Sequence, residues 1–487
     1  MKASRSKHFV VVGGGLAGLA AAESLVRHAS VTLIEPSGRL GGMVATVRCG
    51  GWLVERSADS FLAARPEGIA MVQRLGLSSE LVGVDRRVRR ALIYHAGRAI
   101  PVPAGFRLLA PGQIGSILST SLLSPLAKLR MLAERFVPIR QAVSDAYDDE
   151  TLEHFAVRRL GRQVFERLVQ PLVAGIWTAD PARLSMAAAC PEFLEMEQHC
   201  GSLWAGERVR LRGTKADQQA TGARYGQFVT LASGMETLPL RLGEHLDQAG
   251  VCRITASATR LARRIDGGWD VSLEPTSALP PSHGSGGPVV QADGVVLAVS
   301  AAAAATLLTT VDKPLADALA GIEYAGSAIV SLGFARSDVA HPLDAAGMVV
   351  PRGEHRRILA VSFLSEKFPG RAPPGFVLLR VFVGGALDPE AAQLDDAQLT
   401  SMVIRELADM LGVRGDPRLV QIDRWSHAMP QYHIGHRHRI AQIHERLSFV
   451  RGLALAGAAY EGVGIPQVIA SGQAAAASLE CGGDGRS

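Results

Sequence analysis

The sequence predicts an α/β protein in which a nucleotide-binding domain is assembled from segments that lie far apart along the chain. A strand, a turn, a helix and a second strand follow one another over residues 9–35. Strands return over residues 250–300, and a last strand, a glycine-rich turn and a helix of small residues fill residues 453–479. Because this pattern occurs at both ends of the chain and again in the middle, we expect the three segments to form one domain together.

Length and composition indicate an ordinary globular protein. The chain of 487 residues is long enough for several domains, at roughly 150 residues each. Its 47% of hydrophobic and 20% of charged residues exclude a disordered chain and a coiled coil. The 51 basic residues barely exceed the 46 acidic ones, so a net charge of +5 argues against a nucleic-acid partner.

The N-terminus imitates a secretory signal, because a basic start precedes an apolar run. The three consecutive glycines at positions 13–15 would interrupt the apolar helix that a signal needs, so we expect the segment to stay in a cytoplasmic protein. Residues 108–127, 294–311 and 462–479 are uncharged and approach the length of a membrane span, but Pro, Ser or Gly interrupts each stretch. A transmembrane helix is therefore not expected.

The first βαβ segment carries a G-x-G-x-x-G motif between its strand and its helix. Gly13 permits a tight turn, Gly15 lets the backbone approach a pyrophosphate, and Gly18 lets the helix pack on the strand. Glu35 lies 20 residues after Gly15, at the end of the second strand, where a carboxylate can accept hydrogen bonds from ribose hydroxyls. The alternative interpretation is a glycine-rich turn with a structural role only.

A second glycine run, G-R-x-G-G over residues 38–42, follows directly. Arg39 can neutralise a phosphate, while Gly41 and Gly42 keep the backbone close to a ligand. The run resembles one found in FAD-binding oxidases of the amine-oxidase superfamily. Without that resemblance, a surface turn explains it equally well.

The middle of the chain changes to helical and then to antiparallel patterns. Val164, Leu168 and Leu172 are spaced by four, and a helical subdomain is expected over about residues 105–200. Residues 251–261 are expected to form one strand, and alternating segments between residues 325 and 385 predict antiparallel strands.

No metal site is expected. The five cysteines contain no C-x-x-C pair, and the histidines of residues 427–444 fit no known ligand spacing and lack paired carboxylates. A structural or surface role is favoured for those histidines, which are His427, His433, His436, His438 and His444.

Six segments in register resemble the oxygen-dependent protoporphyrinogen and coproporphyrinogen oxidases. They cover nearly the whole chain in the expected order and are LVERSADSFL (53–62), RRLGRQVFERLVQPLVAGIWTADPARLS (158–185), LASGMETLP (231–239), FPGRAP (368–373), MPQYHIGH (429–436) and LALAGAAYEGVGIPQVIASGQAAA (453–476). The resemblance implies a flavoenzyme of haem biosynthesis that oxidises a porphyrinogen in three two-electron steps and reduces oxygen to hydrogen peroxide. It also implies non-covalent FAD, which carries the chemistry, so no catalytic side chain is assigned.

The resemblance implies three regions. A Rossmann-like FAD-binding domain is expected from residues 1–86, 222–300 and 445–487. An α+β substrate-binding domain is expected from residues 87–104 and 301–444, and a helical subdomain from residues 105–221.

The resemblance also implies which residues hold the cofactor. Ala258, where the family more often has Val, should contact adenine through its backbone. The turn at residues 462–466 should face the isoalloxazine, where a helix N-terminus favours the negative charge of reduced flavin, although an ordinary strand-to-helix loop remains the alternative. The full set is Gly13, Gly14, Gly15, Leu16, Ala17, Gly18, Glu35, Pro36, Arg39, Gly41, Gly42, Met43, Asp59, Ala258, Gly457, Gly462, Val463, Gly464, Ile465, Pro466 and Val468.

For the substrate, the resemblance implies a backbone contact at Gly175 and apolar walls at Val349 and Phe368. Arg90 is the candidate partner for a propionate, because a guanidinium can hold a carboxylate with two hydrogen bonds. The alternatives are a solvated surface role for Arg90 and a core role for the two apolar residues.

Several alternatives stay open. The same fold serves amine oxidases and phytoene desaturases, and a non-catalytic flavin-binding scaffold is a third class. The chain departs from the family at Ser57-Ala58, Trp177-Thr178-Ala179 and Gln467-Val468, near the expected pocket. Residues 107–135 could face the inner side of the cell membrane or pack within the protein. Neither the choice between the two porphyrinogens nor that between monomer and homodimer follows from the sequence.

Overall fold

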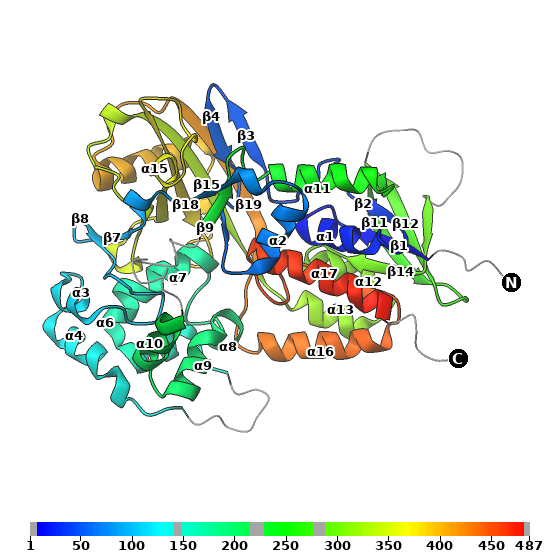
Figure 1. The fold of residues 1–487 in the computed structure, drawn as a ribbon, viewed down its shortest axis with the longest axis horizontal. Helices are drawn as coiled ribbons and strands as arrows, with labels where there is room; N and C mark the ends of the chain where they lie inside the picture. The colour runs from blue at the N-terminus through cyan, green and yellow to red at the C-terminus, as the bar shows by residue number, and fades with distance from the viewer. Residues whose placement is uncertain (1–6, 141–148, 214–227, 277–287, 482–487) are drawn as a thin grey trace.

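The computed structural model describes residues 7–140, 149–213, 228–276 and 288–481. The molecule is elongated, with both termini at one end (Figure 1). A five-stranded sheet lies at that end, and a seven-stranded sheet and a group of helices lie at the other.

The five-stranded sheet is parallel and takes its strands from three distant parts of the chain. Its order is β10-β2-β1-β14-β20, with bounds Cys252–Ile254, Ser30–Ile34, His8–Val12, Gly294–Leu297 and Leu453–Leu455. Alternate side chains of β1 enter different cores, since Val11 faces one and Val10 the other. Helices therefore cover both faces, as a parallel sheet requires.

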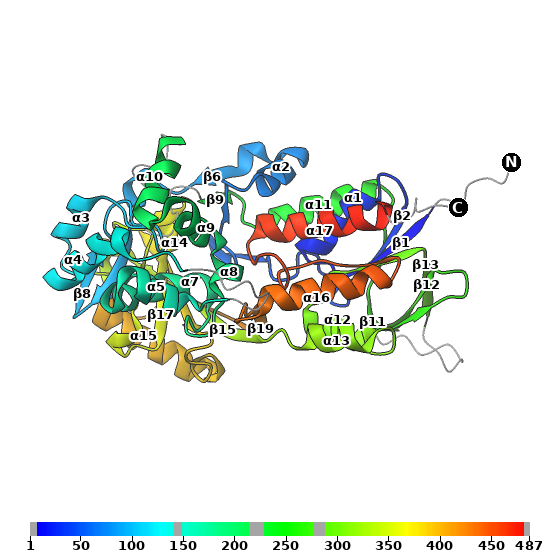
Figure 2. The same cartoon turned by 90° about the horizontal axis from the view of Figure 1, so that it is seen from below.

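Each face has its own set of helices (Figure 2). One face packs against α1, α11 and α17, which span Leu16–Leu25, Thr237–Gln248 and Ile465–Cys481. The other packs against α12, α13 and α16, which span Ala301–Leu308, Lys313–Ala320 and His436–Phe449, together with the antiparallel sheet of β11, β12 and β13, which span Ala256–Arg263, Trp269–Pro275 and Val289–Ala292. The single strand expected over residues 251–261 is wrong, because the chain divides there into β10 and β11 of two different sheets.

The seven-stranded sheet has the order β19-β15-β18-β17-β16-β7-β8. Its bounds in that order are Leu419–Pro430, Tyr324–Ala335, Phe376–Gly384, Ile358–Phe363, Gly347–Val349, Ala91–His95 and Arg98–Pro101. All pairings are antiparallel except that of β16 with β7, which confirms the antiparallel strands expected between residues 325 and 385. Helix α15 (Asp396–Leu411) covers one face.

Shorter elements join the two ends of the molecule. Strands β3 and β4 (Thr46–Cys49 and Trp52–Glu55) form a hairpin, and β9 (Phe228–Leu231) pairs with β5 and β6 (Phe61–Leu62 and Leu81–Gly83). Helix α2 (Pro66–Arg74) packs against α17.

The helical region packs against the other face of the seven-stranded sheet. Its α-helices are α3 to α10, with bounds Ile114–Ser119, Pro125–Leu132, Leu152–Leu160, Arg162–Val164, Gln170–Trp177, Met186–Ala189, Pro191–Cys200 and Leu203–Gly213. The helical pattern predicted from Val164, Leu168 and Leu172 is confirmed, and all three side chains are buried, although residues Phe165–Val169 form a π-helical turn. Helix α7 lies against β16 and β17 and so brings the helical region onto the sheet.

Candidate functional site

Gly13 and Gly18 leave no room for a side chain in the first glycine loop. Gly13 has a φ of +109°, and a Cβ there would lie 2.4 Å from the carbonyl oxygen of Ala298. A Cβ on Gly18 would lie 1.9 Å from the carbonyl oxygen of Gly13. Both positions therefore need glycine for the close approach of backbone to backbone.

Gly15 differs, because the space beside it is open. It lies directly before α1, with a φ of −71°, and a Cβ there would meet no atom within 4 Å. The N–H groups in the first turn of a helix lack intrahelical partners and carry partial positive charge. In α1 this turn begins with Leu16 and Ala17. The space fits an anionic group such as a pyrophosphate.

The second glycine run is fixed onto the first. The Gly41 N–H donates to the carbonyl of Gly14 at 2.8 Å, and Gly42, with a φ of +57°, lies beside Gly15. The Arg39 guanidinium donates to loop carbonyls, including that of Val44 at 3.0 Å. In this structure Arg39 therefore shapes its own loop.

Glu35 binds the first run and Ser37, the residue just before the second run. One carboxylate oxygen accepts the Gly14 N–H at 2.8 Å, and the other accepts the N–H of Ser37 at 2.9 Å and its hydroxyl at 2.7 Å. Pro36 follows Glu35 and accepts a hydrogen bond from the Thr276 hydroxyl through its carbonyl. Ala258 lies on β11, where the pairing with β12 is irregular, and is half-buried.

The C-terminal turn completes the same edge of the sheet. Gly457 follows β20 with a φ of +136°, and its N–H donates to the Ser471 hydroxyl at 3.0 Å. Gly462, with a φ of +143°, begins the approach to α17, whose first residues Ile465 and Pro466 are buried. Val463 packs against the core of the helical region.

These loops all follow the carboxyl ends of parallel strands. Residues 13–15 follow β1, Glu35 follows β2, and Gly457 follows β20. Ligands bind at this edge in open α/β sheets. The glycine cradle, the carboxylate and the α1 N-terminus thus suit the pyrophosphate and ribose of a dinucleotide, while Gly464 and Val468 lie in the turn and first turn of α17 beyond them.

Asp59 binds two cations, Lys367 at the end of the short helix α14 (Leu364–Lys367) and Arg380 on β18. Lys367 Nζ donates to one carboxylate oxygen at 3.0 Å, and Arg380 donates to the other at 3.1 Å. Burial alone would raise the pKa of Asp59, but the two cations outweigh it and hold the pKa well below its usual range. Ser57 nearby donates to the carbonyl of Met43 at 2.6 Å.

The three residues predicted to line the substrate site, Gly175, Val349 and Phe368, lie in two different places. A Cβ on Gly175 would lie 3.7 Å from Val349, so α7 and β16 meet there, and Gly175 itself is exposed. Phe368 is fully buried in a separate cluster with Trp52 and Leu378. The structure therefore brings Gly175 and Val349 together and places Phe368 elsewhere.

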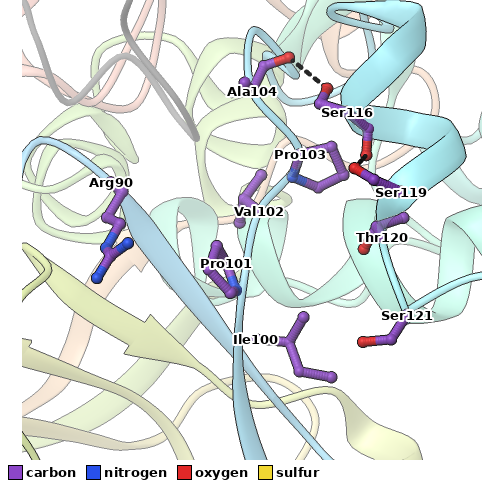
Figure 3. A pocket seen from close by; sticks show the side chains of 10 residues that line it. All are labelled: Arg90, Ile100, Pro101, Val102, Pro103, Ala104, Ser116, Ser119, Thr120 and Ser121. Carbon is purple, nitrogen blue, oxygen red and sulfur yellow. Dashed lines mark hydrogen bonds between the residues drawn. The ribbon is translucent and has the colours of Figure 1, made fainter.

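Arg90 lies at a cavity of about 400 Å³ between the β7–β8 hairpin and α3 (Figure 3). Ser116, Ser119 and Thr120 line the other side. The Arg90 guanidinium donates to the carbonyl of Asp344 at 2.9 Å and to its carboxylate. Arg90 thus has a partner of its own.

Among the described residues, no three His, Cys, Asp or Glu side chains are placed to hold a metal ion. The histidine cluster is spread over β19, which carries His427, the loop that follows it, and α16. His436 is buried, and that burial lowers its pKa to about 4.

Sequence reasoning missed Lys367, Arg380 and Tyr432. Lys367 and Arg380 are separated from Asp59 by more than 300 residues, so no local spacing connects them. Tyr432 lies within the MPQYHIGH segment, and its hydroxyl contacts the C-terminal turn. That segment supports the family resemblance, but its sequence does not indicate which loop the tyrosine reaches.

Comparison with known proteins decides the family. The family described as "Flavin containing amine oxidoreductase" matches residues 16–479. The chain belongs to this family. As a member it is an oxidoreductase whose cofactor is FAD, and its Rossmann-like and mixed-sheet architecture is that of the amine-oxidase fold.

Individual proteins that this chain resembles along nearly its whole length are porphyrinogen oxidases by name. Coproporphyrinogen III oxidase of Bacillus subtilis (strain 168) is 33% identical over 96% of this chain and 97% of its own length. Protoporphyrinogen oxidase of Homo sapiens is 30% identical over 96% of this chain and 98% of its own.

Solved structures agree with the fold. A crystal structure from Exiguobacterium sp. 255-15, described as "Putative protoporphyrinogen oxidase", has a TM-score of 0.83 at 28% identity, and the match covers 98% of this chain and 100% of that one. Cyclohexylamine oxidase from Brevibacterium oxydans IH-35A has a TM-score of 0.66 at 16% identity, over 97% of this chain and 98% of its own, and shows the fold alone.

Proposed function

We propose that the protein oxidises a porphyrinogen, either coproporphyrinogen III or protoporphyrinogen IX, to the porphyrin in haem biosynthesis. The observation that carries the proposal is the likeness over nearly the whole chain to coproporphyrinogen III oxidase of Bacillus subtilis. The contact of α7 with β16 supports it, because it sets exposed Gly175 beside apolar Val349. Such a wall suits the apolar pyrrole rings of the macrocycle.

Bound FAD would supply the oxidising power, since it takes two electrons per cycle and returns them to oxygen as hydrogen peroxide, so that three cycles give the porphyrin. The chain itself binds the FAD and orients the porphyrinogen against it. We assign the pyrophosphate to the Gly13–Gly18 loop, the ribose to Glu35 and the isoalloxazine to the turn at residues 462–466. FAD is held without a covalent bond. Val173 and Trp177 of α7 are buried in the core of the helical region and fix the helix that carries Gly175.

The test is porphyrin fluorescence from the FAD-loaded protein under air with each porphyrinogen in turn. We expect formation well above the autoxidation rate, with one hydrogen peroxide per two electrons removed. The ratio of initial rates shows which porphyrinogen is preferred. No porphyrin above autoxidation, with peroxide formed from an amine instead, would overturn the proposal.

We also propose peripheral contact with the inner face of the cell membrane through α3, α4 and the residues that follow. Exposed large apolar side chains gather there, namely Ile114, Leu118, Leu126, Leu129 and Phe136. Arg135 is exposed beside them and can meet anionic lipid. Other side chains of the same segment, such as Ile117 and Met131, are buried. One side of the segment therefore packs within the protein, while the exposed side chains are available to the membrane. Among the described residues, no helix is long and apolar enough to cross a bilayer.

Sedimentation with vesicles containing anionic phospholipid tests this contact. The double variant Leu126→Ser with Leu129→Ser should lower the bound fraction several-fold, because it removes two exposed apolar side chains from α4. Phe449→Ser is the matched control, since Phe449 is 70% exposed at the end of α16, away from this surface. Equal binding by the double variant and the control would contradict the proposal.

A further inference from the structure

The hydroxyl of Tyr432 spans the turn between β20 and α17. It donates to the carbonyl of Ala458 at 2.6 Å and accepts the N–H of Gly462 at 2.8 Å. Tyr432 itself is 1% exposed. One buried hydroxyl therefore fixes both ends of a five-residue segment whose far end opens the predicted flavin turn.

The Tyr432 ring lies between two other rings. It stacks on His436 with ring centres 4.0 Å apart, and it lies 5.2 Å from the ring of Trp177 at the end of α7. Its backbone carbonyl accepts the N–H of Ser185 at 2.7 Å. Tyr432 thus contacts the helical region through both its ring and its backbone.

Trp177 belongs to the same helix as Gly175, which faces Val349. Val463, next to Gly462, packs against the core that contains Trp177 and Tyr432. The predicted substrate wall and the predicted flavin turn are therefore connected through the side chain of Tyr432.

We propose that Tyr432 is a positioning residue, which holds the turn at residues 458–464 at a fixed distance from α7 and so sets how closely the substrate approaches the flavin. The inference rests on the proposed function for the identity of the substrate. It concerns the hydroxyl, because phenylalanine would fill the same space between Trp177 and His436.

Gly462 explains why the hydroxyl matters. Its φ of +143° lies in a region that glycine tolerates, and glycine also gives the chain other conformations at low cost. Without the Tyr432 hydroxyl, the Gly462 N–H and the Ala458 carbonyl each lose a hydrogen-bond partner, and the turn can relax. A shift of about 1 Å in a reacting group is enough to slow a reaction severely.

The test compares Tyr432→Phe with Tyr94→Phe. Tyr94 is also buried, and its hydroxyl accepts a hydrogen bond from Arg356 at the other end of the seven-stranded sheet. Stopped-flow absorbance without oxygen measures flavin reduction over a range of porphyrinogen concentrations. Tyr432→Phe should lower the limiting reduction rate about tenfold or more with little change in half-saturating concentration, because binding is kept and approach is lost. In Tyr94→Phe the porphyrinogen should reduce the flavin at the wild-type rate.

A second measurement does not depend on the substrate. Tyr432→Phe should weaken FAD affinity about tenfold and change the flavin absorbance spectrum, whereas Tyr94→Phe should do neither. If the wild type oxidises no porphyrinogen, the proposed function fails while this measurement still tests Tyr432. Wild-type reduction rate and FAD affinity in Tyr432→Phe would overturn the inference.

Trp177→Phe tests the other side of the contact if Tyr432→Phe does not fold. It keeps the hydroxyl bonds to the turn but shortens the ring that joins α7 to Tyr432. We expect a slower limiting reduction rate with unchanged FAD affinity. An unchanged reduction rate in this variant would also count against the inference.

Discussion

Glycines in the first loop serve two different physical needs. At Gly13 and Gly18 a Cβ would collide with backbone atoms of the protein itself. At Gly15 it would meet only open space. Substitution should therefore separate a defect of folding from a defect of cofactor binding.

Gly15→Ala should fold as the wild type does but bind FAD at least about tenfold more weakly, because the added methyl occupies the space where we place the pyrophosphate. Thermal melting without FAD measures folding, and quenching of flavin fluorescence measures affinity. Gly353→Ala is the control, since its Cβ also meets nothing within 4 Å, in a short turn after β16. Normal FAD affinity in Gly15→Ala would contradict the placement of the pyrophosphate.

His436 should make stability depend on pH. Burial lowers its pKa from 6.5 to about 4. A backbone hydrogen bond with Tyr460 and the charge of Asp149 oppose this shift, while Arg439 and His433 add to it. The unfolded chain then binds a proton at a higher pH than the folded one, so stability is complete above about pH 7 and falls as the pH drops from 6.5 toward 4. Between pH 7.5 and 5 the loss from this group should be about 2 kcal/mol.

Urea unfolding of the wild type and His436→Phe at both pH values isolates this effect, because other groups titrate alike in the two proteins. The phenylalanine keeps a ring against Tyr432. The variant should lose about 2 kcal/mol less than the wild type over that range. Equal losses would mean that His436 is protonated in the folded protein near pH 6.

The residues that could be predicted are those whose signal is local. The spacing of Gly13, Gly15 and Gly18 beside a strand is by itself enough to predict the loop at the end of β1. The partners of Asp59 could not be found in this way, because Lys367 and Arg380 reach it only through folding. Phe368 is predicted from resemblance, which does not show which neighbours bury it.

At the scale of elements, a buried ion pair holds the helical region together. Arg159 and Glu134 are both fully buried and bonded to each other, which joins α5 to the turn after α4. Glu134 also accepts the N–H of Leu203 at 3.1 Å and the hydroxyl of Ser202 at 2.9 Å, at the start of α10. One carboxylate thus organises three elements.

Glu134→Ala should lower the free energy of unfolding by about 3 kcal/mol, because it removes one of the two buried carboxylates of Arg159, leaves only Glu197 at 3.2 Å, and takes the acceptor from the Leu203 N–H. Glu153→Ala removes one of the two carboxylates near exposed Arg162 and should cost less than about 1 kcal/mol. Calorimetry of both variants measures the difference. Equal costs would show that the Arg159 pair adds nothing beyond a surface pair.

Periodicity predicts the buried stripe of α6 and α7 but not the π-helical turn at Phe165–Val169. The reason is that one wider turn changes the hydrogen bonds without moving Leu168 or Val164 out of the core. Likewise, the continuous run over residues 251–261 gives no sign of the break at Thr255, because both resulting strands have similar composition. Such breaks depend on which sheet offers a partner.

At the scale of the whole molecule, Asp59 links the N-terminal segment to the seven-stranded sheet. Its carboxylate carries two cations, Lys367 and Arg380, whose side chains are 8% and 1% exposed. Asp59→Asn should therefore cost about 3 to 5 kcal/mol, because both cations lose their counter-charge. Asp388→Asn, which weakens a half-exposed pair with Arg357, should cost less than about 1 kcal/mol.

A second substitution tests the cause of the Asp59 effect. Adding Lys367→Met to Asp59→Asn removes one of the two uncompensated charges and should restore part of the lost stability. Denaturation of the single and double variants gives the coupling between the two positions. Simple additivity of the losses would mean that the charges do not interact.

The parallel sheet has a consequence for how the protein is made. Strand β1 is synthesised first, but β14 and β20, which continue the sheet beside it, emerge from the ribosome hundreds of residues later. Until then the nascent chain exposes one edge of β1 and the apolar side of α1, against which α17 finally packs. Capture of FAD must therefore wait until β20 and the turn before α17 have been translated, and until then this apolar surface stays open to non-native contacts.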